Sequence, residues 1–255
     1  MHQKEPFSVS ARELKPLLGS GSFANASIIE IDFGDIKLPA VLKKFHAPEN
    51  CLEELEPILA IDGYQLLKEL GLKVPSIYLL IPKSRSILMP FLGSEYVICV
   101  GPNNPARCSV QLWGHELLDE IPNLEDVWVN LVSDVTKAAN QKIFIANDAQ
   151  FYLWDTKHNK LEYVFADFDN VNQDTSTSAQ EVLLLNIKHA YISLDRFIQS
   201  NINRDKKTSV RLALNEIIKK AVPWIKEDPL KNWSLPAPKL SKLNCILRYP
   251  TNFDF

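Results

Sequence analysis

The chain has 255 residues, 46% of them hydrophobic, and a formal net charge of −3, which is enough sequence for one large domain or two modest lobes with their own cores. No apolar run approaches the roughly 20 residues that span a bilayer, and the amino terminus lacks the apolar region of a signal peptide, so we expect neither feature. Four cysteines without metal-ligand or disulfide spacing argue against zinc and favour a reducing compartment.

The first 92 residues alternate strand-like runs with short breakers. We expect strands over residues 27–33, 38–45, 77–81 and 87–92. Between them, the segment from about Pro57 to Gly71 predicts a helix. Its apolar stripe is expected to run through Leu59, Leu66, Leu67 and Leu70. Asp62 falls on this predicted stripe, where an unpaired charge would be costly, so we expect it to have a cation as partner.

Beyond Gly114, where the last glycine of the chain lies, the pattern becomes helical. Helices are predicted over residues 123–139 and 178–198, with Asn123 as one cap and a Ser178/Glu181 capping box at the other start. A third helix is expected after Thr208. Residues 151–154 and 161–165 flank a polar turn and predict a hairpin. The sequence therefore predicts an α+β protein with two lobes, a β-rich one over residues 1–92 and a mainly helical one over 93–255.

The stretch "LGSGSF" places two glycines on either side of one serine in a chain with only eight glycines. Without side chains, such a backbone can turn sharply and bring successive N–H groups to a phosphate. The residues expected to bind phosphate here are Gly19, Ser20, Gly21, Ser22 and Phe23. Further along, "AVLKKF" reads as a strand with Lys43 on one face, where its ammonium can neutralise phosphate oxygens, and Lys44 on the opposite, solvent-exposed face.

In this order, "LGSGSF" and "AVLKKF" resemble the glycine-rich loop and the lysine-bearing strand of the protein-kinase-like superfamily. Ala24 stands where that pattern has its third glycine. The resemblance implies an acid on the next helix that pairs with Lys43; Asp62 is preferred and Glu56 is the alternative, although Asp62 beside Gly63 would also suit a cap or turn. It further implies a hinge that binds adenine at residues 89–92, including Met89 and Phe91, as in the aminoglycoside-phosphotransferase branch.

Acidic residues flank the predicted hairpin, with Asp148 before it and the triplet Asp167-Phe168-Asp169 after it. A hairpin brings its two ends together, and phosphoryl transfer needs one carboxylate at the attacking hydroxyl and another on magnesium. Asp148 resembles the catalytic-loop aspartate of the kinase-like family, and Asp167 resembles the metal-binding aspartate of its D-F-G motif. Asp169 replaces the glycine of that motif, as it does in the small-molecule kinase branch.

The catalytic loop departs from the family pattern at two positions. Ala146 stands where the family has a histidine, and Leu153 stands where it has the asparagine that binds a second metal ion. Gln150 is our preferred substitute for that asparagine, with Asn147 or the loss of the second metal as alternatives. No long activation loop follows Asp169. Four of the five histidines, His46, His115, His158 and His189, lack partner spacing and are expected to have no catalytic role.

The resemblance implies an ATP- and Mg²⁺-dependent phosphotransferase, an atypical kinase that acts on a hydroxyl of a protein, a small molecule or a lipid headgroup. The alternatives are a pseudokinase that binds nucleotide as a scaffold without turnover, and a nucleotidyltransferase with the same fold. A cytoplasmic location is expected. Secretion into a host cell is the alternative, because bacterial effector kinases show a similar loss of motifs.

Positive charge is concentrated near the carboxy terminus, where residues 201–242 contain ten Lys or Arg against four Asp or Glu. Lys206, Lys207 and Arg211, with Lys219 and Lys220 further along the predicted helix, are expected to form a patch that binds an anionic activator such as an inositol phosphate, an anionic lipid or an acidic protein. The alternative is an ordinary solvated surface. The sequence has no nucleic-acid-binding motif or aromatic interleaving of the kind that DNA or RNA binding requires.

Overall fold

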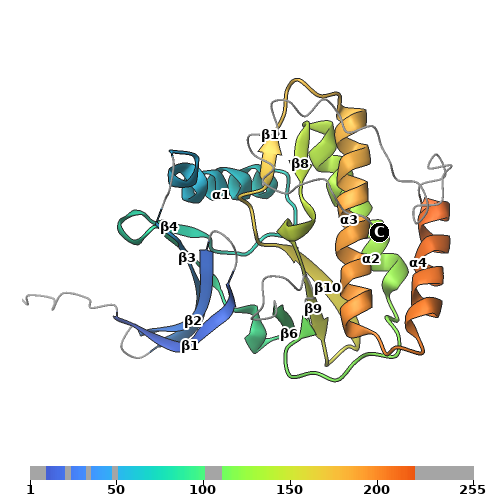
Figure 1. Cartoon of the computed structure of the whole chain (residues 1–255), viewed down its shortest axis with the longest axis horizontal. Helices are drawn as coiled ribbons and strands as arrows, with labels where there is room; N and C mark the ends of the chain where they lie inside the picture. The colour runs from blue at the N-terminus through green and yellow to red at the C-terminus, as the bar shows by residue number, and fades with distance from the viewer. Residues whose placement is uncertain (1–9, 21–23, 33–35, 48–50, 101–110, 222–255) are drawn as a thin grey trace, which may run out of the picture.

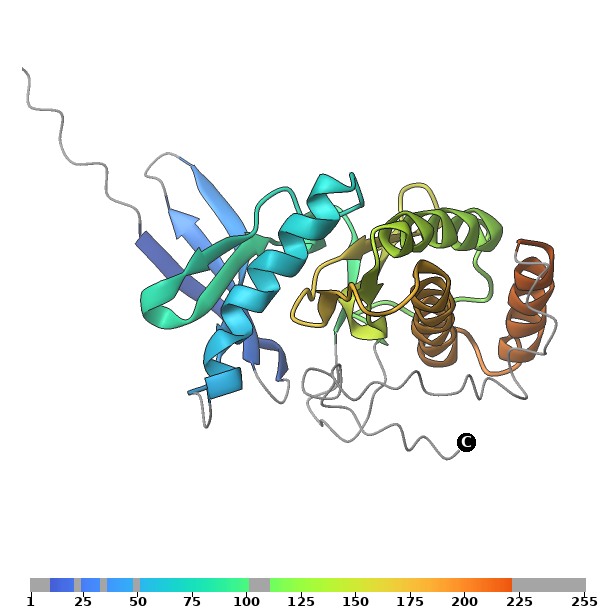
Figure 2. The same ribbon diagram turned by 90° about the horizontal axis from the view of Figure 1, so that it is seen from above.

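The computed structural model describes residues 10–20, 24–32, 36–47, 51–100 and 111–221. The protein is an α+β structure with a β-rich amino-terminal region and helices later in the chain, an arrangement compatible with two lobes (Figure 1). In the view from above, helix α1 crosses obliquely between the amino-terminal sheet and the helical region (Figure 2). Within the described residues, no helix is both long and apolar enough to cross a membrane.

The amino-terminal sheet is antiparallel, with the strand order β1-β2-β3-β5-β4. Its strands are β1 (Ser10–Ser20), β2 (Ala24–Asp32), β3 (Lys37–Phe45), β4 (Leu79–Ile81) and β5 (Ser86–Pro90). The four strands predicted in this region are confirmed, and β1 is one more that the pattern did not indicate. A short 3-10 helix, η1 (Pro82–Ser84), joins β4 to β5. Lys43 therefore lies on the central strand of this sheet.

Helix α1 (Cys51–Glu69) begins earlier than the sequence predicted, so Pro57 lies inside it. Its buried side chains belong to Pro57, Ala60, Tyr64 and Leu67. These positions recur every three or four residues, which defines the face of a helix that contacts the rest of the protein. This face is offset from the stripe predicted through Leu59, Leu66 and Leu70, which are only partly buried.

The second region contains two small sheets. One has the order β10-β9-β6-β7 and is built from β6 (Val97–Val100), β7 (Gln111–Leu112), β9 (Gln150–Asp155) and β10 (Lys160–Phe165). The other pairs β8 (Ile143–Ile145) with β11 (Val171–Gln173). Two 3-10 helices lie at connections, η2 (Leu92–Ser94) before β6 and η3 (Asn147–Ala149) before β9. The hairpin predicted from the sequence is the β9–β10 pair.

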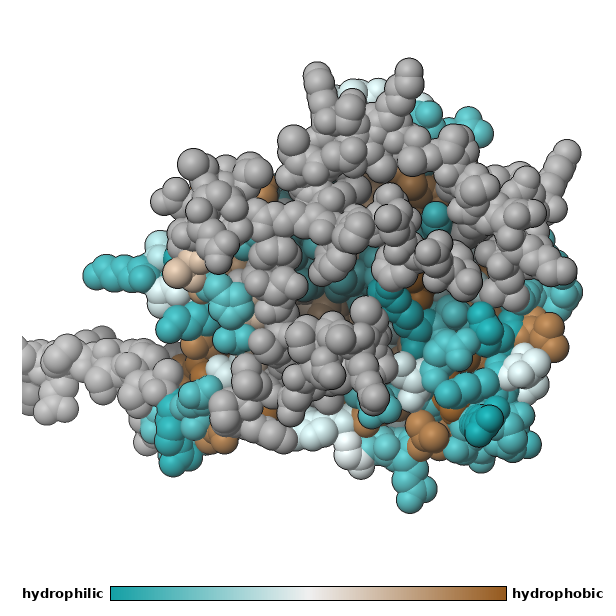
Figure 3. Space-filling view, in the orientation of Figure 1, coloured by the Kyte–Doolittle hydropathy of each residue, from teal (hydrophilic) through white to brown (hydrophobic). Residues whose placement is uncertain are grey.

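Three helices pack side by side in this region: α2 (Leu124–Asn140), α3 (Ala179–Asn201) and α4 (Lys207–Ala221) (Figure 1). Ser178 and Glu181 form the predicted capping box at the start of α3. Asn123 precedes α2 as predicted, but its side chain makes no cap hydrogen bond. On the face drawn in Figure 3, the described residues are mainly hydrophilic, with hydrophobic ones scattered among them.

The core of the helical region forms where α2 and α3 cover the β9–β10 hairpin. Its largest fully buried side chains are Trp128, Leu131, Leu161, Phe165, Leu194 and Phe197. Burying a side chain of this size stabilises the fold by about 1.5–3 kcal/mol each. The hairpin is therefore anchored in this core, and the acidic residues lie at its two ends.

Candidate functional site

The ammonium group of Lys43 is the centre of the candidate site. Lys43 lies on β3 with a side chain that is only 12% exposed, whereas Lys44 is exposed on the opposite face, as strand alternation predicted. Lys43 Nζ forms ion pairs with Asp167 Oδ1 and, at 3.7 Å, with Asp169 Oδ2. Groups 124 residues apart in the chain are thus brought together between the amino-terminal sheet and the second region.

Asp167 is positioned by the end of strand β10. The backbone N–H of Phe165 donates to Lys73 O at 2.8 Å, and that of Ala166 donates to Ala149 O at 3.0 Å. Next to Asp167, the fully buried ring of Phe168 meets Tyr64 and Tyr78 at centroid distances of 5.5 and 4.9 Å. Because Phe168 is anchored among these aromatic rings, the carboxylates on either side of it face Lys43.

Helix α1 contacts the same segment through a glycine. A Cβ atom on Gly63 would lie 2.4 Å from Phe168 O and 3.0 Å from Val171 Cβ. Real Cβ atoms do not approach other atoms that closely, so a glycine is required for the helix to lie here. Gly63 is therefore a packing residue in the middle of α1 and not part of a turn beside Asp62.

Asp148 lies in η3, directly after strand β8. Asn170 Nδ2 donates a hydrogen bond of 3.1 Å to Asp148 Oδ2. The other carboxylate oxygen, Asp148 Oδ1, is buried and has no hydrogen-bond partner among the described residues. The pairing of Ile145 with Val171 between β8 and β11 keeps the two acidic segments adjacent. Asn170 was not singled out in the sequence, although it directly follows the acidic triplet.

The carboxyl groups of the site differ in pKa because their surroundings differ. Burial, followed by the charge of Asp167, raises the pKa of Asp148 from 3.8 to about 6. Burial also opposes ionisation of Asp167, but Lys43 and a hydrogen bond with Asp169 outweigh it and lower its pKa. Burial and the neighbouring Asp167 charge raise the pKa of Asp169 well above its ordinary value. Lys43 therefore favours the ionised form of Asp167, and Asp169 is the carboxyl group of this pair that takes up a proton more readily.

Asp167 and Asp169, the two carboxyl groups that face Lys43, are the residues of this site that could hold a metal ion. Asp169 Oδ1 is buried and has no partner among the described residues. Those residues contain no group of three or more His, Cys, Asp or Glu side chains that would enclose a metal. Mg²⁺ in phosphoryl-transfer sites is typically held by one or two carboxylates, substrate phosphates and water, so two carboxyl groups suffice.

Two polar side chains of α3 hold the strand that leads to Asp148. Asn186 is fully buried; its Oδ1 accepts from Ile145 N–H at 2.9 Å and its Nδ2 donates to Ile143 O at 2.9 Å. One turn later, His189 Nδ1 accepts from Asn147 N–H at 3.1 Å. Sequence analysis gave His189 no role. A signal was present in the sequence, because Asn186 and His189 lie three residues apart on the apolar face of this helix. A buried polar side chain at such a position needs a hydrogen-bond partner.

His189 is held neutral at physiological pH. Burial, followed by the charges of Lys188 and Arg196, lowers the pKa of His189 from 6.5 to about 4. A neutral ring is required for Nδ1 to accept the Asn147 N–H. The same ring nitrogen lies 3.0 Å from Asn147 Oδ1. Because Nδ1 already accepts the backbone N–H, this second contact is not a hydrogen bond, and Asn147 as the substitute metal ligand stays an untested alternative.

Asp62 is not where the sequence placed it. Its side chain is exposed, because the buried face of α1 passes through Ala60, Tyr64 and Leu67 and leaves residue 62 outside. Among the described residues, the ion pairs of Lys43 are those with Asp167 and Asp169. The predicted burial of Asp62 on the apolar stripe was therefore wrong. The alternative, Glu56, is half-buried.

The glycine-rich stretch begins at the end of β1. Gly19 pairs with Ala26 on β2, and Ala26 pairs on its other side with Lys43. Adjacent strands lie about 4.8 Å apart, so the backbone of Gly19 is roughly 10 Å from that of Lys43. Ser20 ends the strand, and Gly21, Ser22 and Phe23 lie outside the described residues. The described part of the stretch is thus near the lysine.

The predicted hinge lies where the chain leaves the amino-terminal sheet. Met89 lies on β5 and pairs with Val41 of β3. Phe91 follows β5, and its backbone nitrogen lies 3.4 Å from Pro39 O. Gln150, the preferred substitute metal ligand, is buried at the start of β9, and neither its amide oxygen nor its nitrogen has a partner within the described part of the chain. Adenine binding and metal binding by these residues stay predictions.

The predicted basic patch is largely compensated by acidic neighbours. Nε of Arg211 on α4 lies 2.7 Å from Oδ1 of Asp195 on α3. Lys206 and Lys219 form ion pairs with Asp205 and Glu216 at 3.5 and 2.8 Å. Three of the five cations of the predicted patch therefore have a carboxylate beside them. These ion pairs reduce the uncompensated positive charge at this surface, and anion binding at Lys206, Lys207 and Arg211 stays a prediction.

No protein-family model matches this chain, and neither does any curated protein.

Proposed function

We propose that the protein is an ATP- and Mg²⁺-dependent phosphotransferase of the protein-kinase-like kind, acting on a hydroxyl group of a protein, small molecule or lipid. The observation that carries the proposal is the meeting of Lys43 on strand β3 with Asp167 and Asp169. A lysine on this strand and an aspartate after the catalytic hairpin are the parts that kinases use to hold phosphates and metal.

Each residue has a distinct role in this proposal. The Lys43 ammonium binds phosphate oxygens of the nucleotide. In the structure this ammonium is paired with the Asp167 carboxylate, so the phosphates compete with that carboxylate for it. Asp167 and Asp169 would hold the magnesium ion, which would supply positive charge to the phosphates. Asp148 orients the acceptor hydroxyl and takes its proton. With a pKa of about 6, Asp148 is ionised at neutral pH and yet more basic than an ordinary aspartate.

A thermal-shift experiment tests the nucleotide site. MgATP is expected to raise the melting temperature of the wild type by several degrees and that of Lys43→Ala hardly at all, because a ligand stabilises only the form that binds it. Lys44→Ala is the matched control, since Lys44 is exposed on the same strand and should leave the shift unchanged. Equal shifts for wild type and Lys43→Ala would refute the assignment.

Labelled ATP separates phosphoryl transfer from the alternatives. Transfer of label from the γ position supports a kinase, and transfer from the α position supports a nucleotidyltransferase with the same fold. Asp167→Ala should abolish magnesium-dependent transfer while the fold is retained. Binding of MgATP without transfer of either label to any acceptor or to water would favour the pseudokinase.

A further inference from the structure

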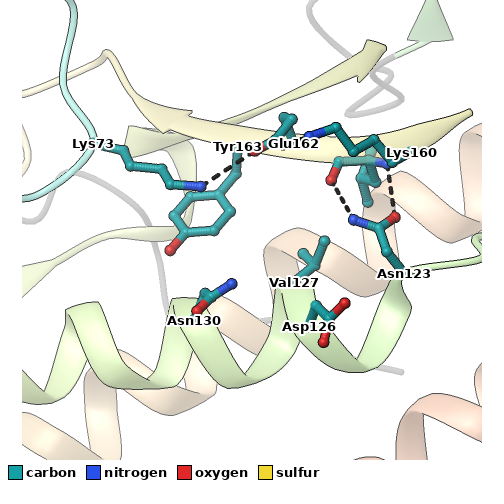
Figure 4. A pocket seen from close by; sticks show the side chains of 9 residues that line it. Lys73, Asn123, Asp126, Val127, Asn130, Lys160, Glu162 and Tyr163 are labelled. Carbon is teal, nitrogen blue, oxygen red and sulfur yellow. Dashed lines mark hydrogen bonds and ion pairs between the residues drawn. The ribbon is translucent and has the colours of Figure 1, made fainter. Parts of the chain in front are cut away.

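The hydroxyl group of Tyr78 is buried without a hydrogen-bond partner. The side chain of Tyr78 is 5% exposed, and its hydroxyl bonds to no group within the described residues. Tyr163, which lines the small polar cavity drawn in Figure 4, is buried to a similar extent, but its hydroxyl donates to Asp134 Oδ2 at 2.9 Å. Because buried polar groups in proteins almost always have a partner, the Tyr78 hydroxyl requires an explanation.

The strand register places Tyr78 on the same face of the amino-terminal sheet as Lys43. Lys43 pairs with Ile87 of β5, and Ile87 pairs with Leu80 of β4, so these three side chains share one face. Tyr78 precedes Leu80 by two residues, and the intervening Leu79 is exposed, as alternation along a strand requires. With strands about 4.8 Å apart and about 3.3 Å per residue, the backbones of Lys43 and Tyr78 are roughly 12 Å apart. The extended side chains of a lysine and a tyrosine together cover such a span.

Aromatic contacts hold the ring of Tyr78 in place. It stacks on Tyr64 of α1 at a centroid distance of 5.0 Å and meets Phe168 edge-on at 4.9 Å. Phe168 stands between Asp167 and Asp169 in the chain. The ring of Tyr78 is therefore packed next to the segment that carries these two carboxyl groups.

The charges that act on the hydroxyl agree with this placement. Burial raises the pKa of Tyr78, and the positive charge of Lys43 opposes this rise. Among the charges that act on the hydroxyl, that of Lys43 has the largest effect, ahead of those of Asp167 and Asp169. The hydroxyl is therefore neutral at physiological pH, and its oxygen can accept a hydrogen bond from an ammonium group.

Lys43 needs a second acceptor if phosphates are to compete for it. Within the described part of the chain, its ion pairs are with Asp167 and Asp169, and no acid of helix α1 takes part. We propose that Tyr78 is a positioning residue for Lys43, whose Nζ donates to the Tyr78 hydroxyl when it does not donate to Asp167, and that this contact keeps the ammonium directed toward phosphate. The lysine side chain is flexible and its ammonium carries three donors, so Nζ can exchange one acceptor for another while strand β3 stays in place. The role toward phosphate rests on the proposed function, whereas the contact between Tyr78 and Lys43 does not.

The contact is tested first without nucleotide. In protein labelled with ¹³C at Cζ of tyrosine, the Tyr78 resonance reports on its hydroxyl and is assigned by its loss in Tyr78→Phe. Asp167→Asn/Asp169→Asn removes both competing carboxylates, so the Tyr78 resonance should shift from its wild-type position. Adding Lys43→Met to these two substitutions should remove most of that shift. An unmoved resonance, or an equal shift in the presence of Lys43→Met, would contradict the contact.

Nucleotide affinity then tests the positioning role. Tyr78→Phe keeps the ring and removes only the hydroxyl, so it should keep the wild-type melting temperature and weaken MgATP binding about five- to tenfold in a calorimetric titration. Tyr64→Phe is the matched control. It removes a hydroxyl that donates to Pro75 O at 3.2 Å, so it should lower the melting temperature and leave the affinity for MgATP unchanged.

Two outcomes separate this inference from the proposed function. If the wild type and Tyr78→Phe bind MgATP equally well, the positioning role of Tyr78 is overturned while the nucleotide site stands. If the wild type does not bind MgATP, the proposed function fails, and the ¹³C experiment decides the contact between Tyr78 and Lys43 by itself.

Discussion

The buried imidazole of His189 should make stability depend on acid in a defined pH range. Its pKa falls from 6.5 to about 4 in the fold, first because of burial and then because of Lys188 and Arg196. The unfolded chain therefore binds a proton at a higher pH than the folded protein does. The stability that this group contributes is complete above pH 6.5 and is lost as the pH falls toward 4. From these values, the loss at pH 5 is about 2 kcal/mol.

The variant His189→Asn removes the titrating group and keeps an oxygen near the position of Nδ1, where the Asn147 N–H donates. We expect the free energy of unfolding in urea to fall by about 2 kcal/mol more in the wild type than in this variant between pH 8 and pH 5. His46→Asn, at an exposed position of the amino-terminal region, should keep the wild-type difference. If the free energies of unfolding of the wild type and His189→Asn differ by the same amount at pH 8 and at pH 5, the reasoning is refuted.

Three further substitutions test the site. Asp148→Asn should raise the free energy of unfolding above pH 6 by up to about 3 kcal/mol, with no gain below pH 4. It should also lower the rate of phosphoryl transfer at least about 100-fold. Equal stability of this variant and the wild type at pH 8 would contradict the buried charge. Gly63→Ala should destabilise the protein by about 1–3 kcal/mol, because the added Cβ would meet Phe168 O. Alanine usually stabilises a helix relative to glycine, so a gain in melting temperature would be evidence against that contact. Asn186→Ala should cost about 2–4 kcal/mol and speed hydrogen exchange at Ile145, and a loss of stability without faster exchange would not fit.

Local patterns predicted the elements of the fold well, because each depends on residues close in the chain. The Ser178/Glu181 capping box and the β9–β10 hairpin are confirmed as predicted. The clustering of the acidic residues followed from that hairpin, since its ends must meet. Only the placement of Lys43 beside this cluster depended on contacts between residues far apart in the chain.

Predictions that depended on distant contacts were less successful. The buried face of α1 is set by Gly63 against Phe168, a contact that the helical pattern does not contain, so Asp62 was assigned to the wrong face. Arg211 was assigned to an uncompensated patch because its partner Asp195 belongs to another helix. His189 and Asn186 were passed over because their partners are backbone groups of β8 and η3, which have no sequence signature.

The aromatic contact around Phe168 also bears on how the chain can be divided. Phe168 belongs to the second region, yet its ring fits against Tyr64 and Tyr78 of the first, and Tyr78 is itself only 5% exposed. A fragment that ended at the boundary near residue 92 would leave both tyrosines facing water, and the complementary fragment would expose a phenylalanine that the intact protein buries completely. Each region thus completes the core of the other, and the two are expected to fold and unfold as one cooperative unit.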